Sequence, residues 1–82
     1  METRVAVIAI IVREQNAAEQ INALLHEAGE YIIGRMGIPY RAKGVNIISV
    51  TIDAPLNVIN SLAGRIGRLH GVEAKTVYAP AD

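Results

Sequence analysis

The sequence predicts an α+β fold, in which a four-stranded antiparallel sheet carries two helices on one face. The first observation behind this prediction is the order of the patterned segments, which read strand, helix, strand, strand, helix, strand along 82 residues. The second is that the first and third strands, residues 3–13 and 45–52, are the most apolar, whereas Pro39 interrupts the second. Right-handed crossovers give the spatial strand order 4-1-3-2, which puts the proline at an edge. This arrangement is the ferredoxin-like βαββαβ sandwich.

The first strand, Thr3 to Arg13, is apolar on both of its alternating faces. The odd positions hold Val5, Val7, Ala9 and Ile11, and the even positions hold Ala6, Ile8, Ile10 and Val12. Because successive side chains of a strand point to opposite faces, this strand needs apolar cover above and below. Two helices cover only one face of the sheet. We therefore expect the other face to lie against another copy or another protein, in a dimer or tetramer.

Helical periodicity predicts one helix after the first strand and another before the last. The first is expected to begin at Asn16, whose side chain would cap it, and to end at Gly29. Its apolar stripe consists of Ala17, Ala18, Ile21, Leu24, Leu25 and Ala28. For the second helix we expect Asp53 as the N-cap, Pro55 in the first turn and Gly71 at the end. Its stripe consists of Ile59, Leu62, Ile66 and Leu69.

The remaining strands are bounded by turn residues. The second strand, Tyr31 to Tyr40, contains Pro39, which cannot donate to neighbours on both sides and so favours an edge position. Gly44 marks the turn before the third strand, which is rich in β-branched residues. The last strand is expected over Val72 to Tyr78.

Length and composition narrow the class of protein. With 82 residues, the chain is expected to form a single domain over residues 1–82. A formal net charge of zero argues against direct nucleic-acid binding. The absence of cysteine excludes disulfides, thiolate metal sites and thiol catalysis. No signal peptide is recognisable and no apolar run is long enough to cross a bilayer, so we expect a cytoplasmic protein with no membrane partner.

Several chemistries that this fold hosts lack the residues they require. RNA binding on the open sheet face needs aromatic side chains on strands one and three, and none of the three tyrosines falls there. A metal-chaperone role needs a Cys-x-x-Cys loop. Acyl-phosphate hydrolysis needs an arginine in an anion-binding loop, and the segment Arg13 to Asn16 is the candidate for it, without a glycine-rich cradle.

The segment from Gly34 to Arg41 is the strongest candidate for a ligand site or an interface. Gly34, Gly37 and the proline are unfavourable in a strand. Their presence therefore indicates another role, such as close approach of another backbone or of a small ligand. Arg35 and Arg41 suit an anionic ligand because guanidinium groups pair bidentately with carboxylates. The alternative is structural: glycines, proline and basic residues protect an edge strand against aggregation. We expect Gly37 to serve close contact between subunits.

Three further features leave alternatives open. His26 lies late in the first helix, either as a surface histidine favoured by the helix C-terminus or as a ligand residue. His70, in the turn before the last strand, has no nearby ligand-type residue. On the second helix, Gly64 and Gly67 lie opposite the apolar stripe, where they indicate either close contact with another helix or fraying.

Residues distributed over the whole chain resemble the small regulator family of the iron-only hydrogenase system. The resemblance lies in Leu25 to Glu27, Tyr31 to Tyr40, Asn46 to Ile48, Leu62 to Gly67 and Leu69 to Val77. More distantly, the chain is similar to the C-terminal regulatory domain of nickel-responsive repressors and to ACT domains, which share this fold and assemble as dimers or tetramers. The resemblance implies an oligomeric, ACT-like regulatory domain of anaerobes that senses a ligand or binds a protein, with Tyr40 among the residues of its shared motif.

The nickel site of the distant relatives does not carry over. Their first histidine ligand aligns with His26, but their His-x-His pair falls on Gly37 and Pro39, and their cysteine falls on Val45. Because these three residues have no side-chain donor, we expect no specific nickel site and no resident cofactor. The ribbon-helix-helix segment that binds DNA in such repressors is not recognisable before the first strand, so we expect any role in transcription to need a protein partner.

Two functional classes follow. The first is a non-enzymatic oligomeric regulator, whose ligand-binding or interface residues are His26, Gly34, Arg35, Gly37, Tyr40 and Arg41. The second is a small enzyme or assembly factor that uses the Arg13 to Asn16 loop or the Arg35 to Arg41 segment. We favour the first, because two histidines and scattered carboxylates do not assemble into a catalytic set.

Overall fold

The computed structural model describes residues 2–80. The strands are β1 (Arg4–Val12), β2 (Ile32–Tyr40), β3 (Val45–Ala54) and β4 (Val72–Tyr78), and the helices are α1 (Ala17–Glu27) and α2 (Leu56–Gly67). Two single 3-10 turns, η1 (Gly29–Tyr31) and η2 (Arg41–Lys43), flank β2. The single domain expected over residues 1–82 includes Met1, Ala81 and Asp82, which lie outside the described residues.

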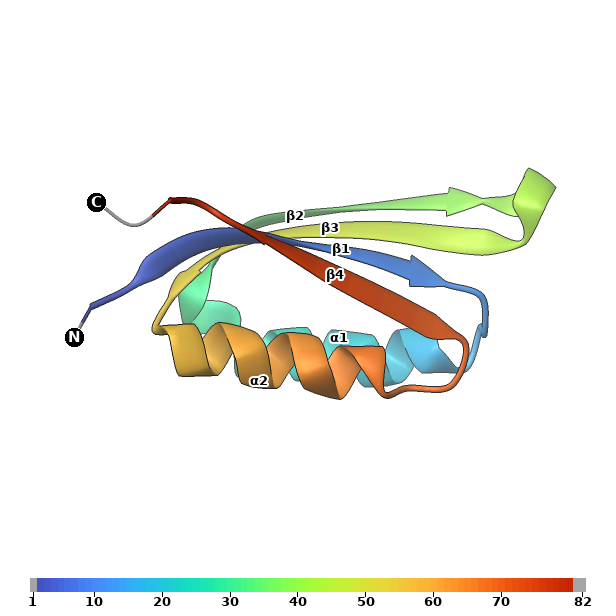
Figure 1. The fold of residues 1–82 in the computed structure, drawn as a ribbon. Coiled ribbons are helices and arrows are strands. Elements are labelled where there is room, and N and C mark those ends of the chain that lie inside the picture. Colours follow the sequence, from blue (N-terminus) through green and yellow to red (C-terminus); the bar gives the residue numbers. More distant parts are fainter. Residues whose placement is uncertain (1, 81–82) are drawn as a thin grey trace.

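The four strands form one antiparallel sheet in the order β2-β3-β1-β4, and both helices lie on the same face of it (Figure 1). This confirms the ferredoxin-like arrangement. Strand β2 is an edge, as its proline required, and Pro39 pairs with Asn46 of β3 near the end of the hairpin. The two apolar strands, β1 and β3, are central, where each has a neighbour on both sides.

Strand β1 divides its side chains between two environments. The even-numbered side chains face the helices and form the centre of the core, with Ile8 and Ile10 fully buried. They pack against Ile21 and Leu25 of α1 and Ile59 of α2, among others. The odd-numbered side chains face away from the helices, where Val5 remains 41% exposed and Val7 37% exposed. The chain therefore covers one of the two apolar faces of β1 and leaves the other exposed.

The helix ends differ from their predicted caps. Asn16 does occupy the N-cap of α1, but its backbone is already helical (φ −67°, ψ −18°) and its side chain makes no capping hydrogen bond. The helix ends at Glu27, with Ala28 rather than Gly29 as the C-cap. Asp53 does not cap α2, because β3 continues through it to pair with β1, and Pro55 takes the N-cap position instead.

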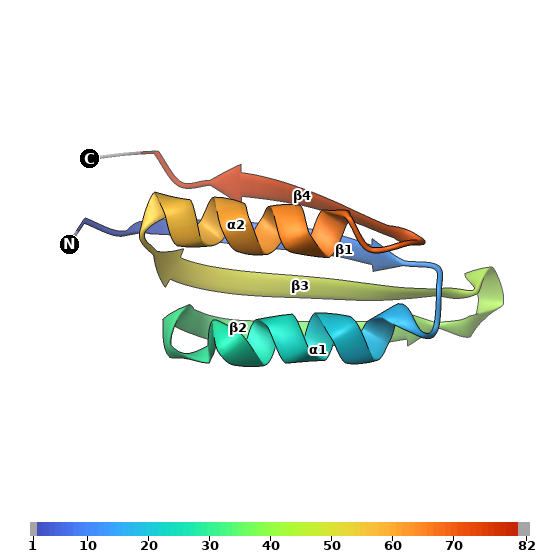
Figure 2. The same ribbon diagram turned by 90° about the horizontal axis from the view of Figure 1, so that it is seen from below.

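The β2–β3 hairpin extends beyond the helical layer. Figure 2 shows the two strands and η2 reaching past the start of α1 and past the β1–α1 loop. This extension contributes to the elongated shape of the molecule, 41 × 19 × 18 Å. Gly44 closes the hairpin in a left-handed conformation (φ +66°), as its position in the turn predicts.

Candidate functional site: the open sheet face and the hairpin end

The face of the sheet opposite the helices is called here the open face. The strand register builds it from rows that run across all four strands. One row reads Ile38, Ile47, Ile11 and Glu73; the next reads Met36, Ser49, Ala9 and Lys75; the third reads Gly34, Thr51, Val7 and Val77. Side chains in a row lie on the same face, so these residues form a continuous surface.

The open face carries apolar side chains across its whole width, with a few polar residues among these side chains. Its large exposed side chains are Val5, Val7, Met36, Ile38, Tyr40, Ile47 and Val77. Met36 is 61% exposed and Val77 is 70% exposed, on the two edge strands. Ser49 and Thr51 lie in the middle, and Glu73 and Lys75 lie along β4. A surface of this kind is typical of a contact with another protein, because scattered single apolar residues would not line up over four strands.

Glu73 on β4 is held by Arg13, which follows the end of β1. The guanidinium of Arg13 donates a hydrogen bond to the Glu73 carboxylate. This hydrogen bond and the positive charge of Arg13 lower the pKa of Glu73 below its ordinary value. Both side chains are exposed, 59% and 66% respectively, so the pair contributes little to stability. It does fix Arg13 at one end of the open face.

The structure separates the six predicted site residues into three places. Gly34 and Tyr40 belong to the open face, because they pair with Thr51 and Val45 there. Arg35 and Gly37 face the helix side, opposite Val50 and Ile48. Neighbouring residues of the candidate segment therefore lie on opposite faces of the sheet.

Arg35 is tied to helix α1. Its Nη2 atom donates a hydrogen bond of 2.8 Å to Oδ1 of Asn22. His26 is exposed one helical turn after Asn22, on the same side of α1. An added β-carbon at Gly37 would meet nothing within 4 Å, so no contact within the described chain requires glycine there.

Arg41, the sixth predicted residue, lies in η2 at the hairpin end. There it lines a pocket of about 380 Å³ together with Arg13 and Gln15 of the β1–α1 loop and Asn46 of β3. The two segments that the sequence offered as separate alternatives therefore meet at one place. Sequence reasoning did not find Asn46, and only its position directly across from Pro39 and Val12 in the sheet brings it there.

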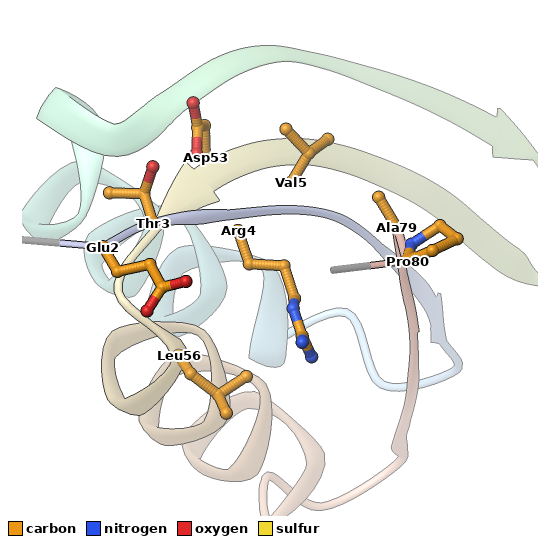
Figure 3. Close-up of a pocket in the computed structure, with 8 residues that line it drawn as sticks. All are labelled: Glu2, Thr3, Arg4, Val5, Asp53, Leu56, Ala79 and Pro80. Carbon is orange, nitrogen blue, oxygen red and sulfur yellow. The ribbon is translucent and has the colours of Figure 1, made fainter. Parts of the chain in front are cut away.

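A hollow of about 530 Å³ lies near both ends of the described chain and is shown in Figure 3. Its charged groups lie on both sides of the sheet: Arg4 points towards the helix side, whereas Asp53 points to the other side. Arg4 instead lies 6.0 Å from the ring centre of Tyr78. A shallow groove also separates α1 from α2, with Leu24 and Arg65 along it. Arg65 forms an ion pair with Glu27, with 3.5 Å between Nη1 of Arg65 and Oε1 of Glu27.

Within residues 2–80, no three histidine or acidic side chains come together in a way that could hold a metal ion. His70 is exposed in the turn before β4. None of the helices that the structure describes has the length and apolar character needed to cross a membrane.

Comparison with known proteins identifies a family. The sequence model of the TM1266-like family, described as "Iron-only hydrogenase system regulator, putative", matches residues 4–76. The solved structure of the uncharacterized protein TM1266 from Thermotoga maritima is 34% identical, with a TM-score of 0.92, and the match covers 96% of this chain and 100% of that one. The comparison with curated proteins gives no match.

Other solved structures share the fold at low identity. The C-terminal domain of the MgtC protein from Mycobacterium tuberculosis is 11% identical with a TM-score of 0.74, over 93% of this chain and 87% of that domain. A formyltetrahydrofolate deformylase from Pseudomonas putida KT2440 is 15% identical with a TM-score of 0.67, over 93% of this chain and 29% of the enzyme. These likenesses support the fold alone.

Proposed function

Because the chain belongs to the TM1266-like family of iron-only hydrogenase system regulators, we propose that it works as a non-enzymatic, homo-oligomeric regulatory module that senses a small ligand or binds a protein partner. The observation that carries the proposal is the open face. Its apolar side chains span four strands and have no cover from the described chain.

A second copy is a suitable cover for this face. Sheets pack face to face about 10 Å apart, with side chains interdigitating, which fits a twisted apolar surface of this width. A two-fold contact brings the same surface together on both subunits and needs a self-complementary distribution of charge. Glu73 and Lys75, two positions apart on β4, provide both signs on one edge of the open face.

The alternative, a small enzyme that uses the loop after β1 or the β2 segment, has one observation in its favour. Arg13 and Arg41 line the same pocket. However, among the described residues that pocket has no histidine and no carboxylate in its lining, so it offers no group for proton transfer near neutral pH. Its donors suit binding of an anion better than catalysis. The regulatory proposal therefore has the stronger support.

Light scattering at micromolar concentration tests the oligomer, with one matched pair of variants. Val77→Lys puts a charge on the open face, whereas Leu56→Lys makes the same change at an exposed position of α2. We expect the wild type and Leu56→Lys to be oligomers, and Val77→Lys to shift to the mass of a single chain with an unchanged circular dichroism spectrum. A monomeric wild type would overturn the proposal.

A further inference from the structure

The pocket at the hairpin end is built from donors that come from separate parts of the sequence. Arg13 and Gln15 belong to the β1–α1 loop, Arg41 to η2 and Asn46 to the start of β3. Figure 2 shows why they meet: the loop passes the projecting hairpin on the helix side of the sheet. Two arginines, a glutamine and an asparagine thus line a single hollow of about 380 Å³.

No acidic residue of the described chain lines this pocket. Glu73 pairs with Arg13 from β4, on the far side of β1, and uses one of the five N–H groups of that guanidinium. The β-carbon and backbone of Glu14 lie against Gly71 in the turn that precedes β4. The pocket therefore keeps an excess of positive charge.

Of the two arginines that line the pocket, Arg41 has no ion pair with a described residue. The ion pairs among residues 2–80 are Arg13 with Glu73 and Arg65 with Glu27, and Arg41 belongs to neither. Its guanidinium can therefore pair with an external anion in bidentate geometry. Lys43, in the same turn, adds positive charge near the pocket without lining it.

The remaining walls are apolar. Val12, Pro39 and Val45 line the pocket beside the polar residues. A lining that combines two arginines with apolar side chains suits a short hydrocarbon chain with an anionic group at each end better than a small inorganic ion, because the hydrocarbon would be removed from water there.

From this geometry we propose that the hairpin-end pocket binds a small organic dicarboxylate, with one carboxylate on Arg13 and the other on Arg41. Gln15 and Asn46 donate amide hydrogen bonds to the same carboxylates. The inference deepens the proposed sensing function, since it names the place and the chemical class of the ligand.

The pocket is also connected to the open face. Pro39 and Arg41 line the pocket, and Tyr40 between them belongs to the open face. A ligand that fixes Arg41 therefore restrains the backbone that positions Tyr40. This gives a route by which an occupied pocket can change the strength of an open-face contact.

Isothermal titration calorimetry with succinate, glutarate and adipate tests the inference on the full chain. We expect one site per chain for at least one of these dicarboxylates. Arg41→Gln and Arg13→Gln should each weaken its binding about tenfold or more, because each removes a charged donor. Arg68→Gln, a matched change on the turn after α2, should leave binding unchanged. Butyrate, with the chain of succinate but one carboxylate, should bind at least about tenfold more weakly than the best dicarboxylate.

Three results would overturn the inference. These are no binding of any of the three dicarboxylates, binding that both arginine variants retain, and binding of inorganic phosphate or butyrate as tight as that of the best dicarboxylate. Light scattering of the same samples separates this test from that of the proposed oligomer. A dimer that binds none of the three refutes only the pocket, whereas a monomer that binds through Arg41 refutes only the oligomer.

Discussion

Glu14 packs against the backbone of Gly71, so that a β-carbon added at Gly71 would lie 2.7 Å from the β-carbon of Glu14. A backbone hydrogen bond from the preceding residue holds this contact in place: the amide of Arg13 donates a 2.8 Å hydrogen bond to the carbonyl of Gly71. The turn before β4 is thereby joined to the loop after β1. This joint holds the loop that carries Arg13 and Gln15.

Gly71→Ala should destabilise the fold. Gly71 has a φ of +75°, which an L side chain rarely adopts, and the new methyl group would clash with Glu14. Both effects point the same way, and we expect a loss of about 1–3 kcal/mol in the free energy of unfolding. Urea denaturation of the variant measures it. Gly67→Ala is the control, because its β-carbon would lie at an ordinary 3.8 Å from Ala74. Equal stability of Gly71→Ala and wild type would contradict the packing described.

Gly64→Ala should have the opposite effect. Gly64 lies inside α2, and an added β-carbon would meet only the flexible end of Arg68 at 3.4 Å. Replacing glycine by alanine in a helix interior stabilises it by roughly 0.5–1 kcal/mol. We expect the variant to unfold at higher denaturant concentration and to keep the oligomeric state of the wild type. Loss of the oligomer would show instead that this glycine serves close helix contact.

The pKa of Glu73 should lie below the ordinary value of 4.5 and return towards it in Arg13→Gln. Because the folded-state pKa is lowered, the pair stabilises the fold above the pKa of the unfolded state. That contribution is lost as the pH falls through the lower folded-state pKa. Carbon-detected NMR titration of the Glu73 carboxyl measures the shift. Lys75→Gln is the control, since Lys75 is the weakest of the groups that lower this pKa. A Glu73 pKa that is the same with and without Arg13 would refute the pairing.

The sequence was sufficient for the element order, the edge position of β2 and the two-sided character of β1, because these depend on periodicity and on proline. The sequence did not predict correctly how the two helices are capped. The pairing of Asp53 with Val5 extends β3 and moves the helix start to Leu56, and this depends on how far β1 reaches. Alternation in β2 could have separated Met36, Ile38 and Tyr40 from Arg35 and Gly37. The meeting of Arg13 and Arg41 could not be foreseen, since it depends on the length of a hairpin that passes a loop.

The register of β2 offers a direct test of which surface joins the subunits. Ile38 lies on the open face opposite Ile47, whereas its neighbour Gly37 lies on the helix side opposite Ile48, with free space around it. Lysine at either position should leave the single chain folded, because edge strands tolerate this residue.

The sequence alone favours a subunit contact at Gly37, whereas the strand register favours one at Ile38. We therefore expect Ile38→Lys to dissociate the oligomer and Gly37→Lys to leave it intact, as measured by sedimentation velocity over a range of concentrations. The two variants share the strand and the new side chain, so a difference between them reports the face alone. The reverse result, an oligomer that survives Ile38→Lys but not Gly37→Lys, would place the contact on the helix side of the projecting hairpin. In that case Gly37 would be explained by close approach of a partner to this edge, and the open face would need a different cover.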